Sequence, residues 1–459
     1  MTEGPLATGP VGELVARLGP DTVVTDPAVM EPYRHDLTRL PAGMPCAVVR
    51  ARGADDVVAA LRWASAHRIP VVARGAGTSL AGGATAVDGG LSLSLEQMTA
   101  IEIDPSTRTA IVEPGALNAA VKARAAEHGL WYPPDPSSFE ISTIGGNIAT
   151  NAGGLCCVKY GVTSDYILGL DIVLADGRLI SLGGKRLKDV AGLPLMRLFI
   201  GSEGTLGIIT GAVLRLLPAP GPASTLVATF SAVRAAADAV VAIGAELRPS
   251  LVELMDNRAI NITEDLVSMG LDRRAGALLL LRSDATGSAR HTEVARIDQL
   301  CRAHGAREVY ATDDPDEGEG FLAARRAFHP ATQRKGSVLI EDIGVPVPRL
   351  PALLDGIAEI AARHHTDIPV VAHAGDGNAH PNLIFDPADA QATQRAEAAF
   401  AEILTLAISL GGTITGEHGV GRTKVSALPD QLGPDVMAVT MAIKTALDPL
   451  GILNPGAAL

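Results

Sequence analysis

The sequence of 459 residues is poor in aromatic side chains and in cysteine, and it has no excess of positive charge. Aromatic residues make up 3% of it, fewer than we expect of a protein that stacks single-stranded nucleic-acid bases on rings. The formal net charge of -13 opposes binding to nucleic-acid phosphates or to an anionic membrane surface. Four cysteines cannot form a disulfide framework in so long a chain, and they indicate a reducing compartment. We therefore expect no nucleic-acid partner.

Two kinds of apolar segment are also missing. The first residues, MTEGPLATGPVGELV, have neither the basic region nor the apolar region of a signal peptide. One window without charges, Ile141–Val158, contains four glycines and two asparagines, a composition typical of a glycine-rich loop and not of a transmembrane helix. We therefore expect a cytoplasmic protein without a transmembrane segment.

The pattern of apolar residues predicts two α+β domains. Hydrophobic residues make up 47% of the chain, enough to form a core in each domain. From Ala47 to Leu217, short apolar runs alternate with segments of helical spacing such as 54–67, and the sequence PAPGPA at 218–223 predicts a boundary. We expect a lead-in over residues 1–44, a first domain over 45–219 and a second domain, acting as a cap, over 220–459.

Three glycine-rich stretches in the first domain predict a site for a dinucleotide. They are RGAGTSLAGG at 74–83, a longer stretch at 133–154 and GSEGTLG at 201–207. Glycine allows the backbone to approach a ligand, and consecutive exposed N–H groups bind a pyrophosphate, next to which Arg74 adds positive charge. A Rossmann fingerprint is the weaker alternative, because Leu80 stands where the third glycine would be.

The motifs in these stretches resemble a known family. The strings VVARGAGTSLAGGA, PPDPSSFEISTIGGNIATNAGG, VKYG and FIGSEGTLGIIT resemble the FAD-binding domain of vanillyl-alcohol-oxidase-type (PCMH-type) flavoproteins. From Pro45 to Pro455 the chain is similar to the branch of these FAD-linked oxidases that holds D-lactate dehydrogenase, the large glycolate oxidase subunit and D-2-hydroxyglutarate dehydrogenase. The resemblance implies an α+β fold, with a PCMH-type FAD-binding domain of two α/β subdomains before an α+β, ferredoxin-like substrate domain.

The resemblance also implies which residues bind FAD. They are Arg74, Gly75, Ala76, Gly77, Thr78 and Ser79 at the pyrophosphate; Pro134, Asp135, Ser142, Gly145, Gly146, Asn147 and Ala149 along the flavin and its ribityl chain; Glu203, Gly204 and Ile208 near the adenine half; and Asn454 near the isoalloxazine ring. Some relatives attach FAD covalently through a histidine of the first stretch. Residues 74–83 contain no histidine or cysteine, so we expect non-covalent FAD.

Two histidines in the second domain are placed to share a ligand. The segment HAGDGNAH, at 373–380, lies between two apolar runs. If GDGN forms a four-residue hairpin loop, His373 pairs with His380, and their Cβ atoms lie roughly 4.5–5.5 Å apart on the same face. Two imidazoles in this arrangement can bind one divalent ion. A purely structural pair of histidines is the alternative.

The sequence EHG at 417–419 offers a third ligand and a base. D-2-hydroxyglutarate dehydrogenase and its near relatives have the same HxGDGNxH and EHG patterns. The resemblance therefore implies that His373, His380 and Glu417 bind a divalent metal, with zinc expected and manganese or iron as alternatives. It also implies that His418 is the general base, since a neutral imidazole accepts protons near pH 7.

An arginine is expected to bind the substrate carboxylate. The segment LAARR at 322–326 resembles the WxxR arginine position of the family, with Leu322 in place of Trp. The resemblance implies that Arg325 binds a carboxylate through two parallel hydrogen bonds. Arg326 is the alternative.

The same comparison bears on the size and charge of the substrate. In D-2-hydroxyglutarate dehydrogenase a lysine on a later strand meets the second carboxylate, and the resemblance places Ile340 at the matching position of this sequence. This difference disfavours a dicarboxylate, although Arg334 or Lys335 could substitute for the lysine.

We therefore expect an FAD-dependent D-2-hydroxyacid dehydrogenase with a metal-assisted site between its two domains, for which D-lactate is favoured and glycolate and D-2-hydroxyglutarate are alternatives. Its electron acceptor could be a quinone, a cytochrome, an electron-transfer flavoprotein or a separate iron–sulfur subunit. The oligomeric state is open, with a homodimer as one option. A non-catalytic flavin-binding subunit and a metal-dependent hydrolase are alternatives of other classes. The histidine and glutamate motifs disfavour the subunit, and the glycine-rich stretches disfavour the hydrolase.

Overall fold

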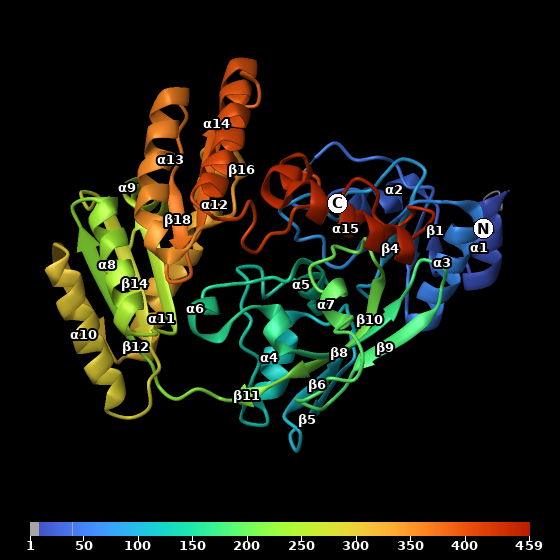
Figure 1. The fold of residues 1–459 in the computed structure, drawn as a ribbon, viewed down its shortest axis with the longest axis horizontal. Coiled ribbons are helices and arrows are strands. Elements are labelled where there is room, and N and C mark those ends of the chain that lie inside the picture. The colour runs from blue at the N-terminus through green and yellow to red at the C-terminus, as the bar shows by residue number, and fades with distance from the viewer. Residues whose placement is uncertain (1–8, 39) are drawn as a thin grey trace. The chain divides into compact units, whose positions relative to one another are not determined.

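The computed structural model describes residues 9–38 and 40–459, which form two compact units (Figure 1). The first unit contains the chain up to Gly153 together with Val162–Ala219 and Glu417–Leu459, and the second contains Gly154–Gly161 and Pro220–Gly416. The segment from Glu417 onward therefore packs with the first unit, whereas the predicted division assigned it to the cap domain. The expectation of no leader segment refers to residues 1–15, and the first eight of these lie outside the described residues.

The first unit begins with a small, mainly parallel sheet. Its strands are β1 (Val23–Val24), β2 (Ala47–Arg50), β3 (Val71–Arg74) and β4 (Leu91–Ser94), and its helices are α1 (Pro10–Leu18), α2 (Pro27–Met30), η1 (Glu31–Tyr33) and α3 (Ala54–His67). The order is β1-β2-β4-β3, with β4 parallel to both β2 and β3. Leu14 of α1 and Trp63 of α3 pack into the core of this sheet. Strands buried on both faces explain the continuous apolar runs of the sequence.

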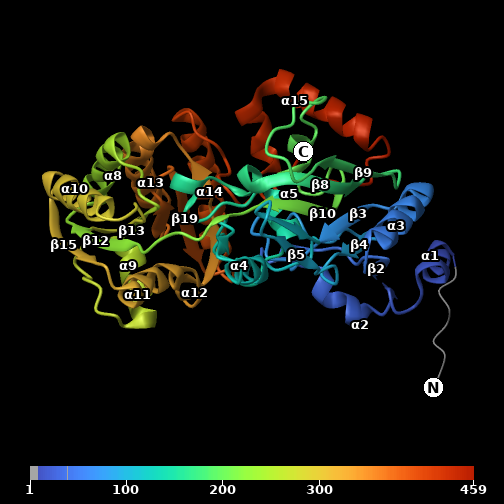
Figure 2. The same ribbon diagram turned by 90° about the horizontal axis from the view of Figure 1, so that it is seen from below.

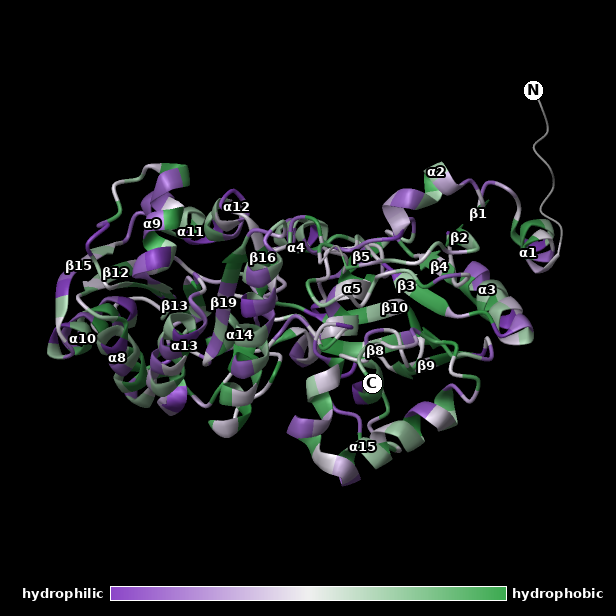
Figure 3. Ribbon diagram, turned by 90° about the horizontal axis from the view of Figure 1, so that it is seen from above, coloured by the Kyte–Doolittle hydropathy of each residue, from purple (hydrophilic) through white to green (hydrophobic). Residues whose placement is uncertain are grey.

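A second, antiparallel sheet completes the first unit. Its strands, in the order β5-β6-β10-β8-β9, are β5 (Ile101–Asp104), β6 (Thr109–Val112), β10 (Ile208–Arg215), β8 (Ile167–Val173) and β9 (Leu179–Gly183). Figure 3 shows β3 and β10 mainly in the colour of hydrophobic residues. The other elements are the strand pair β7 (Leu130–Trp131) and β11 (Leu217–Pro218) and the helices α4 (Asn118–Ala126), α5 (Ile144–Thr150), η2 (Thr163–Tyr166), α7 (Met196–Phe199), η4 (Val425–Ala427) and α15 (Leu428–Leu447).

The second unit is one antiparallel sheet with helices on both faces. Its strands are β12 (Ser224–Phe230), β13 (Leu251–Asp256), β14 (Ala277–Ser283), β15 (Ala306–Thr312), β16 (Ser337–Ile340), β17 (Ile343–Gly344), β18 (Val370–His373) and β19 (Asn378–Phe385). The order is β15-β12-β14-β13-β18-β19-β16, and β17 also pairs with β19. The central strand β13 therefore lies between β14 and β18, deep inside the sheet.

The helices of the second unit form two layers. They are α6 (Cys157–Tyr160), α8 (Val233–Glu246), α9 (Asn257–Val267), α10 (Ala289–Ala303), α11 (Pro315–Arg326), α12 (Phe328–Gln333), η3 (Val347–Arg349), α13 (Leu350–His364) and α14 (Ala390–Ser409). Figure 2 shows α8, α10 and α13 on one face of the sheet and α9, α11 and α12 on the other. Each unit combines helices with sheets, as the α+β expectation requires. Among the described helices, none combines the length and apolar character needed to cross a bilayer.

Asp256 gives the second unit a stability that depends on pH. Its carboxylate is the N-cap of α9 and accepts a hydrogen bond from the N–H of Ala259 at 2.7 Å. Part of the residue remains in contact with solvent, but protein atoms surround the carboxyl group, and this burial raises its pKa to about 7. In the unfolded chain the group loses its proton near pH 4. Between about pH 4 and pH 7 the folded state thus retains a proton that the unfolded state has lost, and the free energy of unfolding falls as the pH rises.

We predict that the Asp256→Asn variant loses this component of the pH dependence. Asparagine still caps the helix through its side-chain oxygen but has no proton to release. Urea unfolding of both proteins at intervals from pH 4.5 to pH 8, conditions chosen to span roughly the interval between the two pKa values, measures the difference. The wild-type midpoint should decline relative to that of the variant as the pH approaches 7 and then run parallel to it. Curves that are parallel throughout would show that Asp256 does not titrate in this range.

Candidate functional site

The loop after β3 has the first glycine-rich stretch, and it fits a pyrophosphate. Within the described chain, none of the N–H groups of residues 75–80 donates a hydrogen bond to the protein. Gly77 has a φ of +70°, and a Cβ atom at this position would lie 2.1 Å from Nη2 of Arg74. The Arg74 guanidinium donates to the carbonyl of His35 at 2.6 Å, and burial lowers its pKa. Uncommitted N–H groups beside a cation are a suitable cradle for the diphosphate of FAD.

The second glycine-rich stretch leads into α5 and is held by buried amide side chains. Asn147 donates to Oγ of Ser142 at 3.1 Å and accepts from Nδ2 of Asn118 at 3.0 Å. A Cβ atom at Gly145 would lie 2.6 Å from Cβ of Pro114, so only glycine allows this close approach. The other residues predicted here, Pro134, Asp135, Gly146 and Ala149, precede α5 or lie within it.

Glu203, in the third stretch, holds two loops of the first unit together. It is 8% exposed, has a φ of +51° and accepts hydrogen bonds from the N–H groups of Val420 at 2.8 Å and Gly421 at 3.0 Å. Burial raises the pKa of its carboxyl, and the two N–H donors oppose part of this shift. Its neighbour Gly204 also has a positive φ, and Ile208 begins β10 inside the core. Contact of Glu203 with the adenine half of FAD remains a prediction.

Asn454 connects the same region to the first glycine-rich stretch. Its side-chain amide donates to the carbonyls of Gly83 and Glu203, each at 2.8 Å, and its own N–H donates to the carbonyl of Val71. The residue is 2% exposed and has a φ of +41°. Three distant parts of the chain therefore meet at Asn454, and its hydrogen bonds hold the first and third glycine-rich stretches together.

In the second unit a buried carboxylate joins two of the predicted site residues. Glu253 is fully buried in β13, directly opposite His373 of β18. Its Oε1 lies 2.7 Å from Nδ1 of His373, and its Oε2 forms an ion pair with Nε of Arg325 at 2.9 Å. Arg325 is itself 8% exposed, whereas the side chain of the alternative, Arg326, is 38% exposed and lies 3.6 Å from Glu319. A buried guanidinium suits recognition of a carboxylate better than an exposed one does.

The predicted register of the β18–β19 hairpin is wrong by two residues. His373 pairs with Asn378, and His380 pairs with Val371, so the loop spans residues 374–377. Gly377 turns the chain with a φ of +83° where a Cβ atom would lie 2.1 Å from the carbonyl of Val345. Because a shift of two residues preserves the face of the sheet, the imidazoles still meet, with ring centroids 5.0 Å apart.

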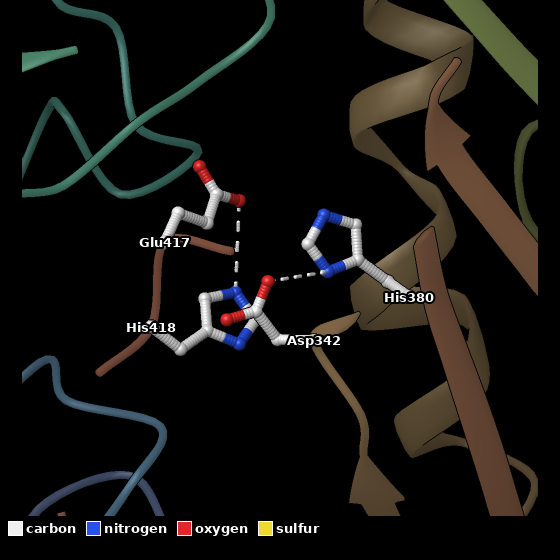
Figure 4. A group of neighbouring side chains, drawn as sticks. All are labelled: Asp342, His380, Glu417 and His418. Atoms are coloured by element: carbon white, nitrogen blue, oxygen red, sulfur yellow. Dashed lines mark ion pairs between the residues drawn. The ribbon is translucent and has the colours of Figure 1, made fainter. Parts of the chain in front are cut away.

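Four side chains form a group suited to a divalent metal (Figure 4). In Asp342, His380, Glu417 and His418, one potential ligand atom from each residue lies within 4.8 Å of all the others. The chain passes from the second unit to the first at the peptide bond before Glu417, and Asp342 accepts hydrogen bonds from the N–H of Gly416 at 2.9 Å and from Oγ1 of Thr415. Imidazole and carboxylate donors are typical of zinc, manganese and iron sites. The residues therefore fit the expected ion.

The structure brings together some of the predicted ligands and adds others. His380, Glu417 and His418 belong to the four-residue group, whereas His373 lies beside it and contacts Glu253. Sequence analysis missed Asp342 and Glu253. Glu253 interrupts an apolar strand sequence, and Asp342 follows one. A carboxylate at such a position indicates a functional role, because a buried carboxylate needs a charged or hydrogen-bonding partner.

Ile340 and Lys335, which bear on the binding of a second substrate carboxylate, lie in a strand pair and in a surface ion pair. Ile340 is the last residue of β16 and pairs with Asn382. Nζ of Lys335 forms an ion pair with Asp265 at 2.7 Å, where both side chains are more than two-fifths exposed. Lys335 is therefore committed to a surface carboxylate.

We predict that Asn454→Ala destabilises the first unit and weakens FAD retention. The substitution leaves two carbonyls without their donor and places alanine at a positive φ, which together cost about 3 kcal/mol. Asn454→Gly is the matched control, since glycine tolerates the backbone conformation but restores neither hydrogen bond. Urea unfolding and the FAD content after dialysis measure both effects. Wild-type stability in Asn454→Gly would show that the hydrogen bonds contribute little.

Sequence comparison relates the chain to flavoproteins. Residues 219–458 match the family described as FAD linked oxidases, C-terminal domain, and residues 45–183 match the family described as FAD binding domain. The chain is 41% identical over 447 residues to glycolate oxidase subunit GlcD of Bacillus subtilis, covering 97% of this chain and 95% of that one. It is 36% identical over 411 residues to D-lactate dehydrogenase of Archaeoglobus fulgidus, covering 89% and 90%.

Structural comparison confirms the fold. The structure of p-cresol methylhydroxylase with substrate bound superposes with a TM-score of 0.81 at 17% identity, covering 99% of this chain and 98% of that one. The structure of 4-ethylphenol oxidase from Gulosibacter chungangensis gives a TM-score of 0.78 at 18% identity, covering 98% and 96%. The expected α+β, PCMH-type architecture is therefore confirmed, and identities this low carry no information about the substrate.

Proposed function

The chain belongs to the FAD-linked oxidase family, and from this premise we propose that it oxidises a small D-2-hydroxy acid to the 2-oxo acid, with D-lactate favoured. The family and its relatives support the coarser statement that the chain is an FAD-linked hydroxyacid oxidoreductase. The observation that carries the finer proposal is the donor group of Asp342, His380, Glu417 and His418. A flavin-binding subunit without catalysis would not need it.

FAD, when bound, supplies the acceptor for the hydride that leaves Cα of the substrate. The protein has to hold this group with its diphosphate in a defined place. The N–H groups of residues 75–80 and the guanidinium of Arg74 serve this purpose. Asn454 and Glu203 keep the surrounding loops in position through their hydrogen bonds.

The residues of the second unit and its C-terminal continuation handle the substrate. Arg325 binds the carboxylate and thereby sets which hydrogen of the substrate is presented for transfer. A divalent ion, held by His380 and Glu417 with His373 or Asp342, would lower the pKa of the substrate hydroxyl. His418 takes the hydroxyl proton on an imidazole nitrogen, as a general base that acts near neutral pH.

A monocarboxylate suits this set of residues better than a dicarboxylate. Arg325 and the ion account for one carboxylate and one hydroxyl. Ile340 is apolar, and Lys335 is already paired with Asp265. Burying a second carboxylate without a partner costs several kcal/mol. Glycolate is the second candidate substrate, favoured by the 41% identity to the glycolate oxidase subunit. The electron acceptor is proposed as a quinone, a cytochrome, an electron-transfer flavoprotein or an iron–sulfur subunit.

We predict that the purified protein is yellow and releases its flavin on acid precipitation. Residues 74–83 contain no histidine or cysteine that could form the expected kind of covalent link. Absorbance of the supernatant and of the redissolved pellet separates the two cases. Colour retained in the pellet would contradict non-covalent binding, and a colourless protein that cannot be reconstituted with FAD would contradict the function.

We predict that D-lactate or another small D-hydroxy acid reduces the flavin with a higher kcat/KM than D-2-hydroxyglutarate does. Anaerobic stopped-flow reduction with a panel of D- and L-hydroxy acids, glycolate included, measures this. Arg325→Ala should weaken all substrates by a similar factor of about 10² because each has the same carboxylate. Arg326→Ala, which removes the exposed neighbouring guanidinium, is the matched control and should leave the rates unchanged. A preference for the dicarboxylate would mean that another cation reaches the substrate.

A further inference from the structure

We propose that Glu253 is a positioning residue that fixes two groups of the proposed reaction at once. One is the guanidinium of Arg325, proposed to bind the substrate carboxylate, and the other is the imidazole of His373, proposed as a metal ligand. This inference rests on the proposed function and adds to it the residue on which the mutual placement of these two groups depends. All three residues belong to the second unit.

The position of Glu253 has no explanation in the packing of the sheet. It is fully buried on a central strand between the apolar residues Val252 and Leu254, where a carboxylate costs several kcal/mol unless it is paired. An apolar residue would satisfy the strand as well. Both of its oxygens are used instead, one by His373 at 2.7 Å and the other by Arg325 at 2.9 Å. We therefore attribute the presence of a carboxylate at this position to its contacts with His373 and Arg325 and not to packing of the core.

The contact with His373 determines which ring nitrogen is available. When the Glu253 carboxylate is ionised it can only accept a hydrogen bond, so in that state Nδ1 of His373 is the donor and Nε2 is the nitrogen that could bind a metal. A metal-binding histidine held by a carboxylate at its other nitrogen is a recurrent arrangement. His380 has the same kind of neighbour, since Oδ1 of Asp342 lies 3.8 Å from its Nδ1. This contact is longer than a hydrogen bond, so of the two imidazoles only that of His373 is held by a carboxylate at hydrogen-bond distance.

The contact with Arg325 acts on the same carboxylate from another element. Arg325 comes from the last turn of α11, and its Nε is the nitrogen that faces Glu253. The guanidinium has two further nitrogens, Nη1 and Nη2, and its planar arrangement of donors allows it to bind a substrate carboxylate through two parallel hydrogen bonds. A displacement of Glu253 moves both partners, so the carboxylate site and the metal ligand depend on one buried group.

The test compares Glu253→Gln with Glu253→Asp and with a matched control in the same unit. Glutamine keeps the size of the side chain but loses the charge and presents an NH2 group to one partner. Aspartate keeps the charge but is too short to reach both partners. Glu264→Gln is the control, because Glu264 is also buried and its oxygens accept hydrogen bonds only from the backbone N–H groups of residues 269–271 among the contacts described.

Zinc affinity provides a measurement that needs no substrate. Metal-stripped, FAD-loaded protein is titrated with Zn²⁺ against a chromophoric chelator. We expect Glu253→Gln to bind zinc about 10–100-fold more weakly than wild type, as for other residues that hold a metal ligand, with FAD content unchanged. Glu253→Asp should show a smaller loss, and Glu264→Gln should match wild type. If Glu253→Gln does not fold, the aspartate variant decides the question. Wild-type zinc affinity in the Glu253 variants, or no zinc binding by the wild-type protein, would overturn the inference.

Substrate kinetics with D-lactate test whether Glu253 also positions Arg325. A positioning role predicts that Glu253→Gln raises KM and lowers kcat together, because Arg325 and His373 both lose their orientation. A purely structural role predicts a lower unfolding midpoint with unchanged KM and zinc affinity, and this result would overturn the inference. A wild-type protein that binds zinc but oxidises no 2-hydroxy acid would contradict the proposed function alone, because the zinc titration would still decide the role of Glu253.

Discussion

The first unit depends on the hydrogen bonds of two side chains, Glu203 and Asn454. The glycine-rich loops have few side chains of their own to pack, and their backbone groups need partners. The Glu203 carboxylate supplies acceptors for the segment at Val420–Gly421, and the Asn454 amide supplies donors for the carbonyls of Gly83 and Glu203. The loops are thereby held by groups outside the stretch of residues 75–80, which keeps its N–H groups for a ligand.

The sequence allows the fold and part of the candidate metal group to be predicted where a local pattern decides. Helix α3 was expected over 54–67 and spans those residues, because its apolar spacing and its flanking residues act locally. The PCMH-type fold followed from the resemblance of the glycine motifs and is confirmed by the structural comparison. Arg325, His373 and His380 were predicted from short motifs, and the structure shows each of them buried, while their roles stay predictions.

The remaining features depend on contacts between distant residues, which no local pattern contains. Glu253 contacts Arg325 and His373, which lie 72 and 120 positions further along the chain. The residues next to Glu253 in sequence therefore do not indicate which residues it pairs with. The hairpin register was predicted from loop length alone, whereas the loop also meets a distant segment, because the carbonyl of Gly377 accepts a hydrogen bond from the N–H of Val345. Asp342 was overlooked because no ligand motif surrounds it in sequence, and the residues that hydrogen-bond to it, Thr415 and Gly416, lie far along the chain.

The division of the chain has a consequence for the order in which the protein folds as it is synthesised. The second unit is almost continuous, from Pro220 to Gly416, whereas the first unit includes the final segment from Glu417 to Leu459. During translation the ribosome releases the complete second unit first. The carbonyls of Gly83 and Glu203 lack their hydrogen-bond donor until Asn454, near the end of the chain, has been synthesised. A chain truncated before Asn454 would therefore retain a complete second unit, but the glycine-rich loops of the first unit would lack the side chain that joins them.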